Sequence, residues 1–332
     1  MNKPILQALA NCDFKKDILR KALLFKRKEQ AELFKLARQR RRAHFPFEEV
    51  EVRSVIEISN ICQRRCNFCN INSYSKIKKY IIKYEDLVKI AENIYHKNRR
   101  VILVQSGENR SGKFIDFVCK FVRDVKQRFS GLKIILCLGS LSYNQYKKLH
   151  QAGADRYILK FETSNPLLYK QIKPDCSLRE RIKRIKQLSK LGFEVGTGNI
   201  IGLPNQTVDD IIDDLLFINN FKLTMASTSV FIPPESSNYW NKPMGDVNIA
   251  LNYTALMRIM YPALLIPSTS SLERAKRGGQ YLGLIAGANT VTIHNGTPVE
   301  LKKYYPIYSV KRFTPDENYI KNIVKKAHSH FK

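Results

Sequence analysis

The 332-residue sequence has few acidic residues, no long apolar run and no regular cysteine framework. No stretch reaches the roughly 18 consecutive apolar residues that cross a bilayer, so no transmembrane helix and no membrane partner are expected. The N-terminal stretch MNKPILQALANCDFKKDILRK mixes charges into its apolar part and lacks a small-residue cleavage site, which argues against a secretion signal. The seven cysteines are odd in number and irregularly spaced. They argue against a secreted disulfide scaffold, and a reducing, cytoplasmic location is predicted.

The scarcity of acidic residues leaves a formal net charge of +28, from 57 Lys and Arg against 29 Asp and Glu. Such an excess reflects solvated basic faces, or it serves an acidic partner such as nucleic acid, an acidic protein or a phosphorylated substrate. Residues 14–42 combine twelve Lys and Arg with three Asp and Glu and have apolar residues at helical spacing. They predict an amphipathic basic helix or helix pair packed on the main domain. Aromatic residues suited to base stacking are not interleaved there, so nucleic acid is the less favoured partner.

From residue 52 onward, short runs rich in β-branched residues alternate with longer stretches of helical spacing. Strands are predicted at 52–59, 99–106, 132–139, 155–162, 193–202, 225–232, 263–269 and 289–295. Helices are predicted between them at 84–97, 112–129, 142–153, 177–191, 207–220, 248–261 and 277–286. Sustained alternation of this kind requires a parallel sheet. Eight repeats favour an α/β fold of the TIM-type (β/α)8 barrel, open or closed, over the alternative of a doubly wound open sheet.

The same pattern divides the chain into three parts. Residues 1–50 form the predicted basic helical N-terminal extension, 51–300 the barrel, and 301–332 a C-terminal extension with a short helix. In parallel α/β folds, ligands bind at the carboxyl ends of the strands. The chemically unusual stretches fall at those ends: CQRRCNFC after the first strand, SGEN after the second, LGS after the third, FETSNP after the fourth and GNIIGLPNQT after the fifth.

Three of the seven cysteines, Cys62, Cys66 and Cys69, are crowded into the eight residues CQRRCNFC. Thiolates at this spacing hold soft metals or an iron–sulfur cluster. A structural zinc site requires four closed ligands, and the next Cys or His along the chain is the distant His96. An iron–sulfur site is therefore favoured, with zinc and a remote fourth ligand as the alternative. Three ligands on a four-iron cube would leave one iron open for a reacting molecule.

The spacing CxxxCxxC, with the aromatic Phe68 before the last cysteine and a position after the first strand, resembles the signature of the radical S-adenosylmethionine (SAM) enzymes. The finer resemblance is to the group that contains biotin synthase, the [FeFe]-hydrogenase maturase HydE and methylornithine synthase. It rests on IEISNICQRRCNFC, VQSGEN, GADRYILKFETSNPLLYKQIKPD, GLPNQTVDDIIDDLLFI and AGANTV, and it extends from about residue 50 to 300.

This resemblance implies a [4Fe-4S] cluster and SAM as cofactors, with reductive cleavage of SAM to a 5′-deoxyadenosyl radical that takes a hydrogen atom from a substrate. Cys62, Cys66 and Cys69 would ligate the cluster. The residues implied to bind SAM are Phe68, Gly198 and Asn199 on the adenine side, the turn of Ser106, Gly107 and Glu108 after the second strand, and the pair Glu162 and Arg181. The planar guanidinium of Arg181 suits the SAM carboxylate, and Glu162 would bind the amine or the ribose.

Candidate catalytic residues on the substrate side are Cys137, Lys160 and His294. Cys137 lies two residues beyond Ile135, on the same strand face, and is interpreted as an active-site thiol, a ligand or a small core residue. Where the biotin synthase pattern has cysteines for a second cluster, this sequence has Ile135 and Gly196, and Lys160-Phe161 replaces an Arg-His of HydE. Further polar candidates are Ser268, Thr269, Ser271, Glu273, Arg274, Asn295 and Thr297, with Tyr304 and Tyr305 as residues that could close the cavity.

The function expected from the resemblance is that of a radical SAM enzyme of cofactor biosynthesis. Three versions are open: sulfur insertion of the biotin or lipoyl type, HydE-like maturation of a hydrogenase cofactor, and a methylornithine synthase-like rearrangement. The implied partners are SAM, a small-molecule or carrier-protein-bound substrate, an acidic lipoyl carrier among them, and an electron donor such as flavodoxin or ferredoxin. A function of another class, a zinc-stabilised basic nucleic-acid-binding protein, stays open as the alternative.

Overall fold

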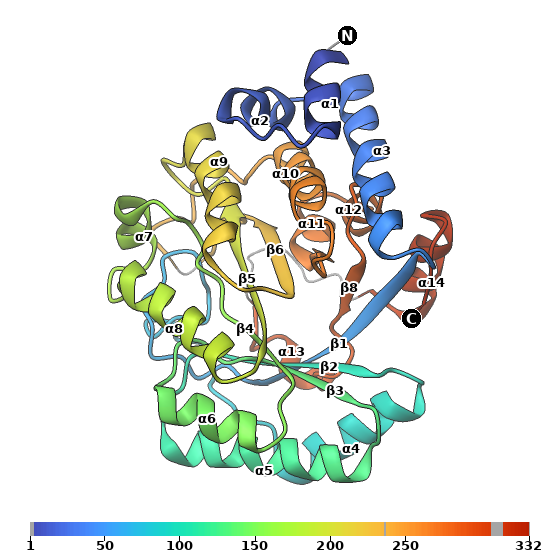
Figure 1. Ribbon diagram of the computed structural model, residues 1–332. Coiled ribbons are helices and arrows are strands. Elements are labelled where there is room, and N and C mark those ends of the chain that lie inside the picture. The colour runs from blue at the N-terminus through green and yellow to red at the C-terminus, as the bar shows by residue number, and fades with distance from the viewer. Residues whose placement is uncertain (1–2, 236, 307–314, 332) are drawn as a thin grey trace.

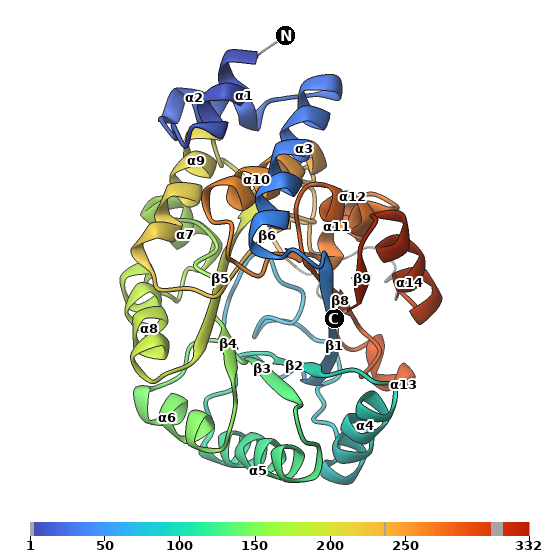
Figure 2. The same cartoon turned by 45° about the vertical axis from the view of Figure 1, so that its right-hand side comes forward.

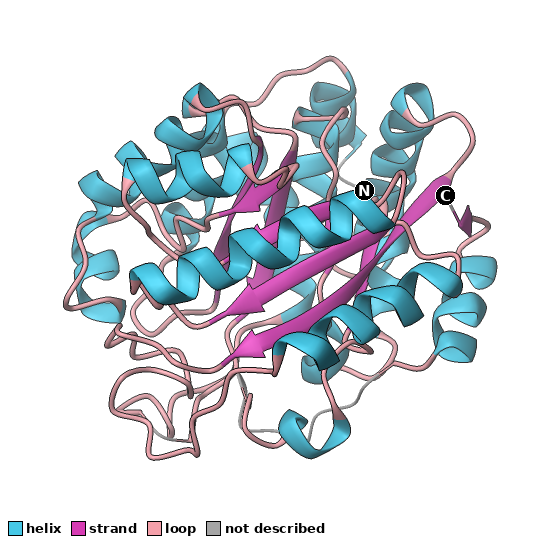
Figure 3. Ribbon diagram, turned by 90° about the horizontal axis from the view of Figure 1, so that it is seen from below, coloured by secondary structure: helices cyan, strands magenta, loops and turns pink. Residues whose placement is uncertain are grey.

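The computed structural model describes residues 3–235, 237–306 and 315–331. Eight parallel strands form a nearly closed barrel, which confirms the predicted α/β barrel. Figure 3 shows strands of this sheet from the side, running next to one another with helices outside them. In chain order the strands are β1 (Glu49–Ser59), β2 (Val101–Ser106), β3 (Lys133–Cys137), β4 (Arg156–Ile158), β5 (Glu194–Ile201), β6 (Met225–Val230), β7 (Pro267–Ser268) and β8 (Thr290–Ile293). Their order around the barrel is β6-β5-β4-β3-β2-β1-β8-β7. Sequential strands are therefore neighbours, as is usual when a helix returns the chain to the next parallel strand.

The barrel closes between β6 and β7 through a short contact. Met225, at the start of β6, forms an isolated parallel bridge with Leu265, and the Leu265 amide donates to the Thr224 carbonyl at 2.9 Å. Pro267 has no amide hydrogen to add a further ladder bond, and β7 stays two residues long. The seam between β6 and β7 is therefore the weakest part of the sheet.

Amphipathic helices cover the outside of the barrel (Figure 1). Those at predicted positions are α4 (Tyr84–His96), α5 (Gly112–Arg128), α6 (Tyr143–Gln151), α8 (Leu178–Lys190), α9 (Val208–Phe217), α10 (Val247–Met260) and α12 (Gly279–Ile285). A 3-10 turn, η1 (Ile218–Asn220), follows α9, and three short helices were not predicted: α7 (Pro166–Ile172), α11 (Ser270–Ala275) and α13 (Val299–Lys302). Helix α7 begins where the Asn165 side chain accepts hydrogen bonds from two amides and Pro166 takes the first helical position.

The strands carry side chains into two separate cores. The large outer core lies between the sheet and the helices. A small inner core inside the barrel consists of Val55, Val101, Leu103, Ile135 and Met225. Val101 and Met225 begin their strands, so the inner core fills the amino-terminal end of the barrel and leaves the carboxyl ends free to line a cavity.

The N-terminal segment folds into three helices: α1 (Lys3–Ala10), α2 (Lys16–Leu23) and α3 (Arg27–His44). Of the helix or helix pair predicted for residues 14–42, the structure has the pair, α2 and α3, and α1 is additional. Figure 2 shows α3 running beside α10 and α12. Basic side chains of this segment bond to the barrel. The buried Arg41 donates to the Ala288 carbonyl at 2.9 Å, and Lys16 forms an ion pair with Asp213 at 2.5 Å. The segment therefore attaches to the barrel through its cations as well as its apolar face.

The C-terminal segment adds the predicted short helix, α14 (Glu317–Lys326). It is followed by β9 (His330–Phe331), which pairs in parallel with the start of β1. Residues 307–314 of the predicted C-terminal extension lie outside the described residues. Among the described helices, none combines the length and apolar character needed to cross a membrane.

Candidate active site

The three clustered cysteines lie on a loop, here called the cysteine loop (residues 60–75), that follows β1. The loop is fixed internally by the Asn72 side chain, which donates to the Cys66 carbonyl at 3.1 Å. It is fixed externally by the end of α7 and the residues after it, because the Asn67 amide donates to the carbonyl of Ile172, the last residue of α7, at 2.9 Å and the Arg65 amide to the Asp175 carboxylate at 3.3 Å. The short helix that the sequence did not predict is therefore the support of the cysteine loop.

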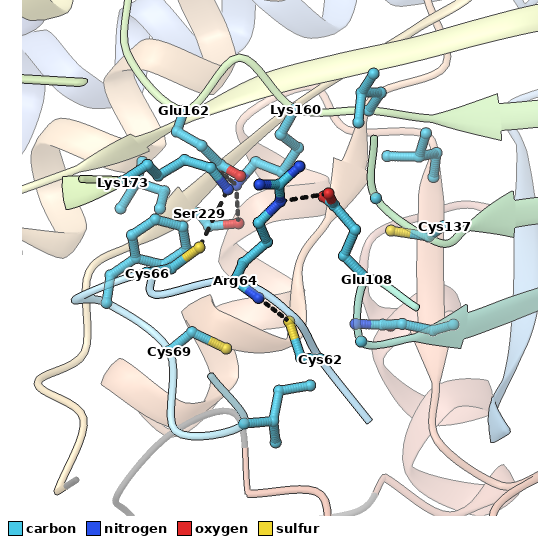
Figure 4. A pocket seen from close by; sticks show the side chains of 18 of the residues that line it. Cys62, Arg64, Cys66, Cys69, Glu108, Cys137, Lys160, Glu162, Lys173 and Ser229 are labelled. Atoms are coloured by element: carbon cyan, nitrogen blue, oxygen red, sulfur yellow. Dashed lines mark hydrogen bonds and ion pairs between the residues drawn. The ribbon is translucent and has the colours of Figure 1, made fainter. Parts of the chain in front are cut away.

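Cys62, Cys66 and Cys69 are unpaired and all line one cavity of about 290 Å³ at the carboxyl end of the barrel. Figure 4 shows their sulfur atoms at one end of this pocket, with Lys173 next to Cys66. Burial raises the pKa of the Cys62 and Cys69 thiols above the usual range. These two thiols therefore become thiolates readily only when a positive group binds them.

The arrangement fits an iron–sulfur cluster better than a single ion. Within the described residues, no three Cys, His, Asp or Glu side chains converge on one ion position, whereas zinc would hold each sulfur at about 2.3 Å. Lys173 Nζ, in a residue that is 5% exposed, lies 3.2 Å from Cys66 Sγ. Burial alone would lower the pKa of Lys173, but the neighbouring Cys66 sulfur outweighs this and the pKa is raised. A buried ammonium beside three thiols suits an anionic, multi-iron group in this cavity.

The turn after β2 meets the cysteine loop directly. Ser106, Gly107 and Glu108 line the cavity as expected, but Gly107 is required for a reason that the sequence did not reveal. A Cβ at this position would collide with the Ile61 carbonyl and the Cys62 side chain. The absence of a side chain at Gly107 thus allows the cysteine loop to pack closely against this turn. The Gly107 amide also donates to the Ser59 carbonyl at 3.1 Å.

The Glu108 carboxylate is held by the protein. It accepts hydrogen bonds from the Ser140 amide at 2.8 Å and from the Arg64 side chain, and it pairs with Arg110 at 2.9 Å. Arg64 also reaches Asp175 at 3.4 Å. Neither arginine was identified from the sequence, because the close spacing of the cysteines marks the cysteines themselves and neither Arg64 between them nor the distant Arg110. Glu108 therefore orients the cysteine loop through Arg64, and its predicted contact with SAM stays a prediction.

Glu162 and Arg181 face the same cavity from β4's end and from α8. Glu162 has a positive φ of 67°, and this conformation is held because its amide donates to the Gly198 carbonyl at 3.0 Å and its carbonyl accepts from the Ile200 amide at 2.9 Å. Arg181 is buried and donates to the Tyr169 hydroxyl at 3.2 Å. Burial would lower the pKa of Arg181, but Tyr169, Glu108 and Glu162 outweigh it, and the pKa is raised. Arg181 therefore stays a cation that faces the pocket.

The three residues expected on the adenine side differ in placement. Phe68 lines the cavity and packs against the apolar cluster that contains Ile172 and Phe231. Gly198 and Asn199 do not line it: Gly198 lies against the Ser227 backbone, and Asn199 is fully buried with its side-chain nitrogen 3.1 Å from Asp214. The two residues lie on opposite faces of β5: Asn199 is directed at α9, whereas Gly198 is on the same face as the cavity-lining Gly196 and Ile200. The Gly198 carbonyl also holds the amide of Glu162, and the predicted contact of Gly198 and Asn199 with the adenine stays a prediction.

Asp214, on α9, is a buried carboxylate that the sequence did not mark. It accepts hydrogen bonds from the amide and hydroxyl of Ser164, from the Thr163 hydroxyl and from Asn199. Burial outweighs these bonds and raises its pKa to about 7. Asp214 thereby joins α9 to the loop after β4, which carries Glu162.

A second cavity of about 150 Å³ lies inside the barrel, below the first. The two share the lining residues Gln105, Cys137, Ile158, Lys160 and Ser229. Burial raises the pKa of Cys137 to about 11, so its thiol is neutral near pH 7. Lys160 Nζ lies 3.2 Å from Ser229 Oγ and 3.3 Å from Glu162 Oε2. Cys137 and Lys160, two of the predicted catalytic residues, therefore lie at the junction of the cavities.

His294, the third predicted catalytic residue, lines the second cavity with Thr269 and the unpredicted Ser270. Its Nδ1 lies 3.0 Å from the buried Glu57 carboxylate and its Nε2 3.3 Å from Ser270 Oγ.

Other predicted polar candidates have structural partners instead. Glu273 accepts from the Gly278 and Gln280 amides, while Ser268, Ser271 and Thr297 bond to Gln280, Val230 and Glu57, respectively. Tyr305 lines the first cavity.

The base of the second cavity contains an arginine that was also missed. Arg53 is 1% exposed, and its Nε donates to Glu51 at 2.7 Å. Its Nη2 has no hydrogen-bond partner among the described residues, and the side chain lines the cavity. Gly196 also lines this cavity, whereas Ile135 belongs to the inner core. Cys137 is thus the one cysteine on the walls of the second cavity.

Comparisons with known proteins agree with this geometry. Residues 56–218 match the model of the radical SAM superfamily. The chain is 34% identical over 311 residues to the [FeFe] hydrogenase maturase subunit HydE of Thermotoga maritima, covering 93% of this chain and 88% of the relative. It is 26% identical to a biotin synthase of Pelotomaculum thermopropionicum, covering 80% and 83%. The crystal structure of methylornithine synthase (PylB) superposes with a TM-score of 0.86 at 22% identity, covering 99% of this chain and 97% of that one.

These matches leave the zinc-stabilised nucleic-acid-binding alternative without support, since the matched region contains the end of β1, the cysteine loop and the strands β2 to β5. The similarity to HydE extends over nearly the whole chain. The chain therefore belongs to the radical SAM superfamily, as an enzyme of the group with HydE and biotin synthase whose cofactors are a [4Fe-4S] cluster and SAM.

Proposed function

We propose that this enzyme abstracts a hydrogen atom from a small polar substrate held inside the barrel, in a step of cofactor biosynthesis. The observation that carries the proposal is the shared wall of the two cavities, where Cys137 and Lys160 face both the cysteine side and the barrel interior. When bound, the cluster and SAM supply an electron and a 5′-deoxyadenosyl radical. The barrel walls keep water from the substrate, which a reactive radical requires.

On this proposal, Cys62, Cys66 and Cys69 hold the cluster, and Arg181 and Glu162 hold the carboxylate and amine of SAM. Arg181 suits its task because the buried guanidinium is an obligate cation with donors in a planar fork. Glu162 suits the amine because its carboxylate lines the same cavity, and among the described residues its Oε2 has an ion pair with Lys160 at 3.3 Å but accepts no hydrogen bond. SAM would then replace Lys160 as the main partner of Glu162.

The second cavity supports a small substrate with a polar or anionic group. Its volume of about 150 Å³ and its polar residues Lys160, Ser229, Thr269 and His294 are poorly suited to an extended acyl chain. The unpartnered Nη2 of Arg53 offers a donor for a carboxylate at the base. These features favour the HydE-like version and, second, a methylornithine synthase-like rearrangement. Sulfur insertion is less favoured, because Ile135 and Gly196 replace the second-cluster cysteines.

We also propose a cytoplasmic location and an acidic one-electron donor such as flavodoxin or ferredoxin. The net charge of +28 supports an acidic protein partner. Exposed cations of the cysteine loop and the residues after it, Arg65, Lys76, Lys78 and Lys79, lie near the three thiols in the chain and offer such a partner a docking surface. A carrier-bound substrate such as an acidic lipoyl domain is the alternative partner of this surface.

The test is anaerobic reconstitution of the full chain with iron and sulfide, followed by SAM and dithionite. Formation of 5′-deoxyadenosine is followed by mass spectrometry with an iron–cysteine complex, lysine, dethiobiotin or an octanoylated carrier as candidate substrate. The proposal expects four-iron cluster uptake and stimulation of 5′-deoxyadenosine formation by one of the small polar compounds. Zinc without acid-labile sulfide would overturn it, and stimulation by the octanoylated carrier alone would overturn the small-substrate part.

A further inference from the structure

We propose that Lys173 is a positioning residue that raises the reduction potential of the cluster through a charged hydrogen bond to the Cys66 thiolate. This inference rests on the proposed binding of the cluster by Cys62, Cys66 and Cys69 and adds a residue that controls how easily the cluster accepts its electron. Lys173 lies more than a hundred positions from the cysteine motif along the chain, and only the fold brings it to the site.

Lys173 is directed at the cysteine loop by its backbone and by its neighbours. It is the C-cap residue directly after α7, and its amide donates to the Tyr169 carbonyl at 2.9 Å. Its Nζ lies 3.2 Å from Cys66 Sγ and 5.5 Å from the centre of the Phe68 ring. The preceding Gln171 and Ile172 carbonyls accept hydrogen bonds from Asn67, at 2.7 and 2.9 Å. These hydrogen bonds therefore fix the position of Lys173 relative to the cysteine loop.

The charge of Lys173 has no conventional counterion. Its side chain is buried, and no carboxylate of the described residues lies within 4.0 Å of its Nζ. A buried ammonium without an opposite charge is strongly unfavourable. The Cys66 sulfur is its hydrogen-bond partner. A thiolate that is bound to iron, with the negative charge of the group it holds, would provide the missing counter-charge.

Arg64 gives an instructive contrast on the same loop. Its guanidinium is engaged by Glu108 and lies 3.4 Å from Asp175, so two carboxylates offset its charge. Its amide approaches Cys62 Sγ at 3.4 Å, which contributes only a backbone dipole. Of these two cations, Lys173 is therefore the one whose charge no carboxylate of the described residues offsets within 4.0 Å. Hydrogen bonds to ligand sulfurs and the net charge around a cluster are among the factors that set its reduction potential. The hydrogen bond and the positive charge of Lys173 both stabilise the reduced cluster, because it carries one more negative charge than the oxidised cluster.

The test measures the midpoint potential of the reconstituted full-length protein by redox titration followed by electron paramagnetic resonance, without SAM. Lys173→Met removes the donor and the charge, so the potential should shift to a lower value. Lys173→Gln keeps a neutral donor and should give a smaller downward shift, while Lys173→Arg should stay nearest to the wild type. Lys190→Met removes the same charge from an exposed position at the end of α8, near the start of β5, and should leave the potential unchanged.

Iron content, sulfide content and thermal unfolding are measured on each variant. A Lys173→Met protein with full iron content and an unchanged potential would overturn the inference. Folded protein that loses the cluster in all three Lys173 variants would overturn it as well, because Lys173 would then serve assembly and not tuning. Wild-type protein that takes up no four-iron cluster would refute the proposed cluster site itself, so the two failures are distinguishable.

Discussion

Lys160 Nζ lies 3.3 Å from Glu162 Oε2 at the junction of the two cavities. The two residues are separated by Phe161, which is fully buried in the outer core. Lys160 and Glu162 both line the first cavity, whereas the phenyl ring between them packs into the outer core and anchors the segment. The pair thus joins the side of the pocket proposed for SAM to the side proposed for the substrate.

Replacement of Glu162 tests its proposed contact with the SAM amine. Glu162→Gln removes a charged acceptor, and net contributions of charged hydrogen bonds of about 1.5–3 kcal/mol predict SAM binding weaker by about tenfold or more. Equilibrium dialysis of cluster-loaded protein with labelled SAM measures this. Glu180→Gln, on the more exposed face of α8, is the matched control and should bind SAM like the wild type. Equal affinities of Glu162→Gln and wild type would remove Glu162 from the SAM site.

Gly107 provides a test of how tightly the cysteine loop packs against β2. Gly107→Ala places a Cβ against the Ile61 carbonyl and the Cys62 side chain, so the loop must shift and the first thiol with it. Reconstituted Gly107→Ala should contain much less iron and sulfide per chain than the wild type. Gly112→Ala is the control, because a Cβ there meets no atom within 4 Å, and its iron content should not change. Full iron content in Gly107→Ala would contradict the packing argument.

The sequence predicts the barrel well because its strands and helices have distinct and regular hydrophobic periods. Each strand that the pattern indicates is present, from β1 to β8. Helix α7 was missed because its seven residues are too few for a periodic pattern, although Asn165 and Pro166 form a recognisable helix start. The N-terminal helix pair was recognised, but the sequence could not show that Arg41 is buried on the barrel.

The candidate site was predictable where residues follow one another and obscure where the fold joins distant segments. Cys62, Cys66 and Cys69 are marked by their spacing, and Cys137 by its position two residues from Ile135 on one strand face. Lys173 and Arg64 acquire significance only from burial and from the distance to a sulfur or a carboxylate. In a chain with 57 Lys and Arg, nothing in the neighbouring sequence distinguishes Lys173 or Arg64 from the other basic residues.

Asp214 makes the stability of the fold depend on pH in a defined direction. Burial raises its pKa from the ordinary value of 3.8 to about 7 in the folded protein. The folded pKa lies above the unfolded one, so the protonated carboxyl stabilises the folded protein relative to the ionised carboxylate. This contribution to the free energy of unfolding is fully present below pH 4 and is lost as the pH rises to 7. The free energy of unfolding of the wild type, relative to Asp214→Asn, should therefore fall between pH 4 and 7 and level off above.

Chemical denaturation of the apo-protein at several pH values measures this difference. Asp213→Asn, the neighbouring half-exposed carboxylate that pairs with Lys16, controls for the loss of a charge on α9. Its difference from the wild type should show no comparable fall between pH 4 and 7. A wild-type stability that rose relative to Asp214→Asn over this range would show that the hydrogen bonds from Ser164 and Thr163 outweigh burial.

Asn252 on α10 tests the attachment of the N-terminal helices. Its side-chain amide donates to the Leu23 and Phe25 carbonyls at 2.9 and 2.8 Å, and its oxygen accepts from Gln30 at 2.9 Å. Asn252→Ala leaves these buried groups unpaired, which should lower the free energy of unfolding by roughly 2–3 kcal/mol. Hydrogen exchange should increase in α2 and α3 more than in the barrel strands. The exposed Asn248→Ala on the same helix should change neither quantity, and equal behaviour of the two variants would contradict the attachment.

Cys137 distinguishes a thiol of the substrate cavity from a fourth cysteine ligand. It lines the same first cavity as the triad, but it lies on β3 and not on the cysteine loop, and it also borders the second cavity. Burial raises the pKa of Cys137 as it raises those of Cys62 and Cys69, so its position and not its pKa sets it apart from the triad. Cys137→Ala should therefore retain the iron and sulfide of the wild type and its spectrum, whereas Cys66→Ala should lose most of both. A Cys137→Ala protein with a depleted or altered cluster would make Cys137 a ligand, and the open iron that SAM binding requires would then be occupied by the protein.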